Sequence, residues 1–448
     1  DLLNKKFLLS NLFISTKSVK LKDVIAFFRA IKKDNKTQLY ILENFISKGY
    51  LIADVNLNFD KQGKIKDNFK VSGYIKDGSI NLLNKRKIDR VDLIFETKNK
   101  NVNIEDLKFS YEKINFTSKK IEFINHGKFV NIEGQINNDE VNLSEKILSN
   151  LVDPLFNISF KNIKFDSENK FFLKINNKFK IKDYEIKSLL NINELTIKND
   201  VNIKNIFPNL QSEIKAKNHK TEIILKKDNL SINGNGDFLV QKNYDQTKYK
   251  INKIKDQYLF NLDYMFAENP VNFDFLNYKS DDKLKTSLKF SGKFVKDKFL
   301  NLEKIKFENG SDFIGIDNLE LTKDFRISNI KSANFNYTDK QNKKNIFQIK
   351  DNKESYVISG KVFNASKLID DLIFGDSKNE NFFSQNFNLD IDIKEVYLHD
   401  KHIVYDAKGY LKFKENNIFD ANLTSQFNQN EKISFTIISD NDQKVTTL

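Results

Sequence analysis

The sequence contains no cysteine and no tryptophan, and it has only three prolines and one methionine among 448 residues. Without cysteine the chain cannot form disulfides, thiolate metal sites or a cysteine nucleophile. It has no run of about 18 apolar residues, so it predicts no bilayer-spanning helix. No charged segment leads into an apolar one, so no signal peptide is predicted. Because the chain begins with Asp1, we expect a fragment or a processed product, with any membrane anchor outside it.

Arginine is also scarce, although the formal net charge is +13. The 74 basic residues include only four arginines, at Arg29, Arg86, Arg90 and Arg326. Base readout and bidentate phosphate contacts favour arginine, and the lysines here are scattered singly between apolar residues. The sequence therefore predicts no nucleic-acid partner. It predicts a solvated surface with some attraction to anionic lipid head groups.

Core-forming residues are few for a chain of this length. Hydrophobic residues make up 39%, below the roughly 45–50% of an ordinary globular protein. Disorder does not follow, because 41 phenylalanines and 15 tyrosines are too many aromatics for a solvated tail. This balance indicates a thin structure with much surface per residue.

The dominant pattern is alternation of apolar and polar residues with a period of two, which is typical of strands with one apolar and one wet face. That pattern favours antiparallel pairing, because buried parallel strands read as continuous apolar runs. None of the three prolines interrupts an alternating run. The clearest alternating segments are 54–60, 171–175, 288–294, 387–394 and 407–413.

A loose phrase recurs, in which glycine occupies an apolar-face position inside a predicted strand. Glycine there marks a bulge, a bend or a close approach of two backbones. Two interpretations stay open: ordinary coiling of the sheet, or a sheet folded lengthwise into a trough with glycine at the crease. The glycines concerned are Gly73, Gly134, Gly292, Gly360 and Gly409.

Three short segments predict helices between the strands. Ser18 is a candidate cap for a helix over 21–31, and Ser144 for one that stops at Pro154. A third runs from about Ser366 to Gly375, where glycine suits the C-cap. No confident internal boundary emerges. We expect residues 1–448 to form one repetitive β-sheet structure, in which 199–208 and 241–268 are the least regular regions.

No constellation of residues points to catalysis. His399 and His402 lie in a predicted turn without a third ligand, and His126 and His219 are predicted to lie in polar turns, where we expect them to be solvated. Neither a phosphate-binding glycine loop nor a Gly-x-Ser-x-Gly elbow occurs. The sequence therefore predicts a protein that is not an enzyme and that holds no cofactor or metal.

The apolar face itself is the remaining candidate site. It either packs as the core of a closed sandwich or stays uncovered, in which case a long apolar strip needs a ligand such as an acyl chain. The residues predicted to line such a groove are Val55, Leu57, Phe59, Val71, Ile75, Ile132, Ile136, Leu288, Phe290, Phe294, Phe387, Leu389, Ile391, Ile393, Leu411 and Phe413.

The C-terminal part of the chain resembles a known family. A strand and glycine at 358–362 precede a Phe-x-Ala-x-x-Leu segment at 363–368, and then a strand of alternating Asp and aliphatic residues at 387–396 and the phrase at 407–411. This order is similar to the AsmA-like C-terminal region of bacterial envelope proteins, and we place its start in residues 350–448. Residues 45–140 more loosely resemble the repeated blocks of the AsmA, TamB and YhdP group.

The resemblance implies an elongated, twisted antiparallel sheet folded into a taco-like groove, with a few short helices. It also implies a periplasmic body, an inner-membrane anchor outside this chain, and the transfer of phospholipid between the inner and outer membranes in outer-membrane biogenesis. Phospholipid or another acyl-chain lipid is the expected partner, and no protein partner is predicted. The alternative is a non-catalytic structural or adhesive cell-surface protein with a closed sandwich or β-helix core.

Overall fold

The protein is mainly β, as the alternation predicts. The computed structural model of the chain describes residues 9–31, 40, 43–66, 68–81, 86–147, 159–178, 180–200, 203–295, 298–369, 383–399, 402–414, 417–427, 431–440 and 443–447. Within these residues, 25 strands belong to one open, largely antiparallel sheet, and β15 and β16 pair separately.

The chain divides into two compact units, a boundary that the sequence does not predict. The first comprises Asp1–Leu195 and Asn218–Leu230, and the second comprises Thr196–Lys217 and Ser231–Leu448. Strands β10, β11 and β12 each contribute residues to both units. The units are described separately below.

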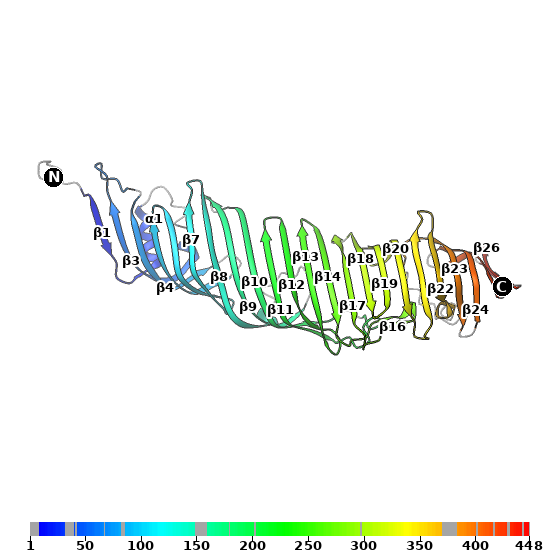
Figure 1. The fold of residues 1–448 in the computed structure, drawn as a ribbon. Coiled ribbons are helices and arrows are strands. Elements are labelled where there is room, and N and C mark those ends of the chain that lie inside the picture. Colours follow the sequence, from blue (N-terminus) through cyan, green and yellow to red (C-terminus); the bar gives the residue numbers. More distant parts are fainter. Residues whose placement is uncertain are drawn as a thin grey trace. The chain divides into compact units, whose positions relative to one another are not determined.

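The first unit is built on a meander of neighbouring antiparallel strands, from β3 to β9. Strands β1 and β2 both pair with β3, α1 lies against β2 and β3, and β10 pairs with β9 (Figure 1). The elements are β1 (Asn11–Ser15), β2 (Val19–Lys20), α1 (Leu21–Ile31), β3 (Ile46–Asn58), β4 (Lys70–Asn81), β5 (Lys87–Lys98), β6 (Asn101–Tyr111), β7 (Ile114–Asn125), β8 (Phe129–Ser144), β9 (Phe160–Asn176), β10 (Ile181–Lys198) and β11 (Glu213–Lys226).

The second unit continues with strands that mostly pair with their neighbours in sequence. Its elements are β12 (Asn229–Leu239), β13 (Tyr244–Ile254), β14 (Gln257–Phe266), β15 (Asn272–Phe273), η3 (Asp274–Leu276), β16 (Tyr278–Lys279), β17 (Thr286–Val295), β18 (Phe299–Asn309), β19 (Asp312–Thr322), β20 (Ile327–Thr338), β21 (Lys344–Asp351), β22 (Tyr356–Asn364), β23 (Phe387–His399), β24 (His402–Lys414), β25 (Asn417–Gln426), β26 (Lys432–Asp440) and β27 (Gln443–Thr447).

One pair in the second unit departs from the predicted antiparallel order. Strands β22 and β23 run parallel, whereas the other described pairs from β13 to β27 are antiparallel. A parallel pair needs a crossover connection, and the segment between Asn364 and Phe387 provides it. The predicted third helix lies in this connection.

One of the three predicted helices is confirmed, and the other two lie only partly within the described residues. The first is confirmed, because α1 spans Leu21–Ile31 and begins three residues after Ser18. For the second, residues 145–147 are helical directly after Ser144, and the rest up to Pro154 lies outside the described residues. For the third, residues 366–369 are helical, and the rest up to Gly375 also lies outside them.

A buried polar cluster links the start of β13 to the end of β14 in the second unit. Asp245 is fully buried, and its Oδ1 accepts hydrogen bonds from the backbone N–H of Ala267 at 2.7 Å and from Asn269 Nδ2 at 2.8 Å. Its Oδ2 accepts one from the Tyr264 hydroxyl at 2.8 Å. Burial raises the pKa of the Asp245 carboxyl, although these three hydrogen bonds oppose the shift. The same burial raises the pKa of Tyr264.

The cluster predicts a pH-dependent stability. Because the folded-state pKa of Asp245 is raised, its favourable contribution is present below the unfolded-state pKa and is lost as pH rises through the folded-state value. Relative to Asp245→Asn, which stays neutral, the wild-type free energy of unfolding should therefore fall as pH rises from about 4 to 7. Urea unfolding, followed by tyrosine fluorescence, measures the free energy of unfolding of both proteins. A difference between them that stays constant over this pH range would contradict the prediction.

The same assay separates the charge of Asp245 from its hydrogen bonds. Asp245→Ala removes the acceptors of three donors, so we expect a loss of about 2–3 kcal/mol in the free energy of unfolding. Asp245→Asn retains a carbonyl oxygen for the donors on Ala267 and Asn269, and it should lose less.

Candidate functional site

Cross-strand register places the predicted groove residues of the first unit on one face of its sheet. Val55 lies opposite Val71, Leu51 lies opposite Ile75, and Ile132 lies between Phe123 and Leu173. One continuous row crosses seven strands from β3 to β9: Ala53, Gly73, Phe95, Ile104, Ile121, Gly134 and Phe171. Leu57 and Ile136 share the face by alternation along β3 and β8. Phe59 lies just beyond β3 and forms an isolated bridge with Ile65.

The nine predicted residues of the second unit also share one face of its sheet. A row crosses nine strands from β14 to β24: Tyr264, Leu288, Phe307, Ile314, Phe335, Phe347, Gly360, Ile393 and Ala407. Phe290 and Phe294 follow Leu288 along β17, and Phe387, Leu389 and Ile391 precede Ile393 along β23. Leu411 and Phe413 lie opposite Leu389 and Phe387 on β24.

The recurring glycines occupy this face at points where neighbouring atoms come close. A Cβ on Gly73 would lie 2.4 Å from the Ile52 carbonyl oxygen, and one on Gly409 would lie 1.9 Å from that of Asn422. Gly292 and Gly360 coincide with register shifts in their ladders. Gly134 also adjoins a register shift, in the β7–β8 pair, whereas the shifts in the ladders of Gly73 fall elsewhere, so glycine marks close approach throughout and a bulge only in part.

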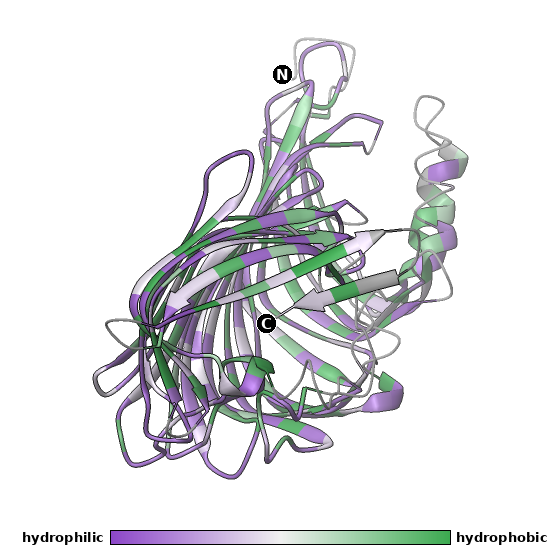
Figure 2. Cartoon of the chain, turned by 90° about the vertical axis from the view of Figure 1, so that its right-hand side faces the viewer, coloured by the Kyte–Doolittle hydropathy of each residue, from purple (hydrophilic) through white to green (hydrophobic). Residues whose placement is uncertain are grey.

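The sixteen predicted residues are covered in part by side chains on adjacent strands of the same face. Fifteen of them are partly buried, and only Ile393 is buried, at 3% exposure. Side chains in a closed sandwich core would be buried by a second layer. Apolar and polar residues alternate along the strands, which Figure 2 shows as alternating green and purple segments. The opposite face carries charged pairs such as Lys70–Glu96, at 2.8 Å.

One part of the second unit's apolar face is covered, which the sequence does not predict. Residues 267–285, here called the cap, connect β14 to β17 and pack against Phe307, Ile314 and Phe335. Val271 and Tyr278 of the cap are buried at 2% and 0% exposure. Leu288 packs against this cluster, so among the predicted groove residues it lies beneath the cap rather than on an open face.

Polar contacts hold the cap in place around its apolar centre. The Tyr337 hydroxyl donates a hydrogen bond to the Leu276 carbonyl oxygen at 3.1 Å, and Asn309 Nδ2 donates one to that of Asp281 at 2.8 Å. Lys340 pairs with Asp274 at 2.8 Å. Burial raises the pKa of the Tyr337 hydroxyl, so this hydrogen-bond donor stays protonated at neutral pH. The cap is therefore a fixed part of the second unit.

In the first unit, a line of register shifts crosses the strands near one of their ends. Shifts occur in the β3–β4, β4–β5, β5–β6, β7–β8 and β8–β9 pairs. Asp77, Arg90 and Asp106 have positive φ angles of 51°, 54° and 50°. Such bulges bend a strand and increase its twist.

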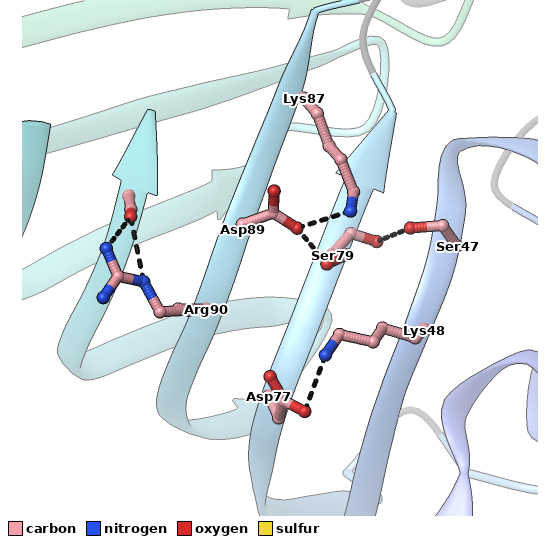
Figure 3. A network of polar contacts seen from close by, with 8 residues as sticks. Ser47, Lys48, Asp77, Ser79, Lys87, Asp89 and Arg90 are labelled. Carbon is pink, nitrogen blue, oxygen red and sulfur yellow. Dashed lines mark hydrogen bonds and ion pairs between the residues drawn. The ribbon is translucent and has the colours of Figure 1, made fainter. Parts of the chain in front are cut away.

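Polar side chains stabilise this line (Figure 3). Lys48 pairs with Asp77, and Lys87 pairs with Asp89, both at 2.8 Å. The hydrogen bond from Lys87, with a second from Ser79, lowers the pKa of Asp89. Arg90, on the same strand as Asp89, donates a hydrogen bond to the hydroxyl of Ser110 on β6 at 2.7 Å. These groups satisfy one another, so the arrangement is a structural seam and offers no nucleophile with a free base.

One of the four histidines takes a different position from the predicted one. His399 and His402 face each other at the β23–β24 turn, and the described residues contain no group of three metal-ligating side chains. His219 is buried at 2% exposure within β11, so its predicted place in a solvated turn is wrong. The alternating segment around it continues as a strand, which turns this side chain inward.

Comparison of the chain with protein-family models, with curated proteins and with solved structures found no match. The AsmA-like resemblance therefore depends on the quoted residues and stays a prediction. No helix of the described residues combines the length and the apolar composition needed to cross a bilayer.

The cap gives a test of how much of the apolar face is covered. Phe273 contacts the Phe307 ring edge-on, with 5.1 Å between ring centroids, whereas Phe275 of the same segment is 67% exposed. We expect Phe273→Ala to lower the free energy of unfolding by about 2–4 kcal/mol and to increase the fluorescence of an added hydrophobic dye. Phe275→Ala is the matched control and should change neither. Equal effects of the two variants would contradict this account of the cap.

Proposed function

We propose that the protein binds phospholipid, or another acyl-chain lipid, on the apolar face of its sheet. In this proposal the sheet curves into a taco-like groove, and the lipid tails lie on the apolar face while the head group stays in water. The protein transfers lipid between the inner and outer membranes of a bacterial envelope. It does so from the periplasm, held by an inner-membrane anchor outside this chain.

The partial exposure of the apolar face is the observation that carries the proposal. The sixteen predicted residues share one face within each unit, and fifteen of them keep part of their surface accessible. An accessible apolar strip of this kind favours an apolar ligand. Each methylene buried on it contributes about 0.8 kcal/mol without directional requirements, so a lipid tail could bind at many positions along the face.

The transfer and envelope parts of the proposal derive from the AsmA-like resemblance of residues 350–448. The parallel β22–β23 pair and its crossover fall inside this motif, at the Phe-x-Ala-x-x-Leu segment. The proposal requires no catalytic group or cofactor, because lipid movement along an apolar surface breaks no bond.

A structural or adhesive surface protein is the second candidate, and the cap is the observation in its favour. Tyr278 and Phe307 are buried under it at 0% and 1% exposure, as in a closed core. In a protein of that kind the apolar face would serve packing alone, and it would take up no lipid.

Two adjacent residues provide a direct test of lipid binding. Phe171 lies on the apolar face opposite Gly134, whereas Phe172 lies on the other face opposite Glu133. Replacing each in turn with a photo-crosslinking phenylalanine analogue changes little in composition but points the reactive group to opposite faces. We expect cross-linked phospholipid from position 171 and little from position 172, measured by mass spectrometry after irradiation in bacterial cells. Equal or absent lipid adducts at both positions would favour the structural alternative.

A further inference from the structure

Lysines gather at one end of the strands of the first unit. The turns that follow β3, β5, β7 and β9 all lie at this end, because β3 to β9 alternate in direction (Figure 1). Six exposed lysines in or directly beside these turns are here called the lysine rim: Lys61, Lys64, Lys66, Lys98, Lys128 and Lys178.

The lysine rim has little negative charge of its own. Asp60 is the described carboxylate in the β3–β4 turn, and its Oδ1 already accepts the backbone N–H groups of Gln62 and Lys64 at 2.8 and 2.9 Å. Asp67 of the same segment lies outside the described residues. Within the described part of the chain, no rim ammonium group pairs with a carboxylate, so the rim keeps a net positive field.

The seam near the other strand ends of the first unit differs, because charges of both signs neutralise one another there. Lys48 pairs with Asp77, Lys87 with Asp89, and Lys164 with Glu140 at 2.9 Å. Lysines of the seam therefore have carboxylate partners, whereas the six rim lysines have none within the described residues.

Apolar side chains are exposed among the rim lysines. Ile65 lies between Lys64 and Lys66 and is 54% exposed, and Ile181 follows Lys180 and is 57% exposed. The apolar face itself begins next to these turns, since Leu57, Val130 and Ile175 are the apolar-face positions of β3, β8 and β9 that lie nearest to them. A group that binds here meets positive charge and apolar surface together.

From this juxtaposition we propose that the lysine rim selects lipids with an anionic head group. The phosphate and any further negative charge lie among the rim ammonium groups, and the acyl chains extend from the rim onto the apolar face of the first unit. This inference rests on the lipid-binding function proposed above and adds the substrate class. Lysine is suited to binding an anionic head group, because its compact and mobile ammonium group attracts phosphate without the fixed geometry of a bidentate arginine contact.

The test compares two lipids that differ only in the head group, which is anionic in one and zwitterionic in the other. The probes are phosphatidylglycerol and phosphatidylcholine with the same fluorescently labelled acyl chain, each titrated into the full chain. We expect phosphatidylglycerol to bind about tenfold more tightly at about 50 mM salt, and the preference to shrink at about 0.5 M salt, where the Debye length falls below about 5 Å. Inorganic phosphate at millimolar concentration should not displace either lipid.

Two matched variants locate the effect, since every substituted side chain is exposed. The rim variant should bring the two affinities close together and leave phosphatidylcholine binding unchanged; it carries Lys61→Gln, Lys64→Gln, Lys98→Gln and Lys128→Gln. The control variant removes the same charge away from the rim and should retain the tenfold preference; it carries Lys76→Gln, Lys108→Gln, Lys113→Gln and Lys119→Gln.

The possible results separate this inference from the function on which it rests. Equal wild-type affinity for the two lipids, or equal loss of preference in both variants, overturns head-group selection and leaves lipid binding standing. Binding of neither lipid removes the proposed function itself. Attachment to phosphatidylglycerol vesicles without uptake of single lipid molecules, seen when gel filtration separates protein from vesicles, overturns the inference in favour of a membrane-contact surface.

Discussion

The register between neighbouring strands is the constraint on which both units depend. Each sheet face is built from side chains two residues apart, so a slip of one residue would exchange the apolar and polar faces. The row from Ala53 to Phe171 in the first unit, and the row from Tyr264 to Ala407 in the second, keep apolar or glycine positions in line across every ladder. Burial on such a face comes mainly from neighbours on adjacent strands, which leaves most of its side chains partly accessible.

The glycines and the aromatic residues follow from this lateral packing. Where two strands approach closely, only glycine leaves room, and the Phe171 ring would lie 3.0 Å from a Cβ on Gly134. Elsewhere aromatic rings cover their neighbours across the ladder, as Phe335 and Phe347 do with 4.5 Å between ring centroids. In the second unit the cap adds a facing layer over part of the same face, and full burial of Phe307 and Tyr337 occurs there. The same alternating pattern therefore gives a covered apolar surface beneath the cap and a partly open one where no facing layer is present.

Polar residues have two separate roles in the first unit. At the seam, opposite charges lie beside the bulges and neutralise one another, so they stabilise a bent part of the ladder. The six lysines of the lysine rim remain without carboxylate partners in the described structure. Average composition conceals this difference, because lysines are spread singly along the whole chain.

Local patterns in the sequence are sufficient to predict the β class, the first helix, the residues that share a face, and the strands around 54–60, 171–175, 288–294, 387–394 and 407–413. These features are local, since a period of two fixes the direction of each side chain along its own strand. Other features emerge from the three-dimensional fold alone: the two units, the cap over Phe307, the parallel β22–β23 pair, the buried position of His219 and the seam at Asp77 and Arg90. Each of these depends on which distant segments meet, and alternation within a strand carries no information about that.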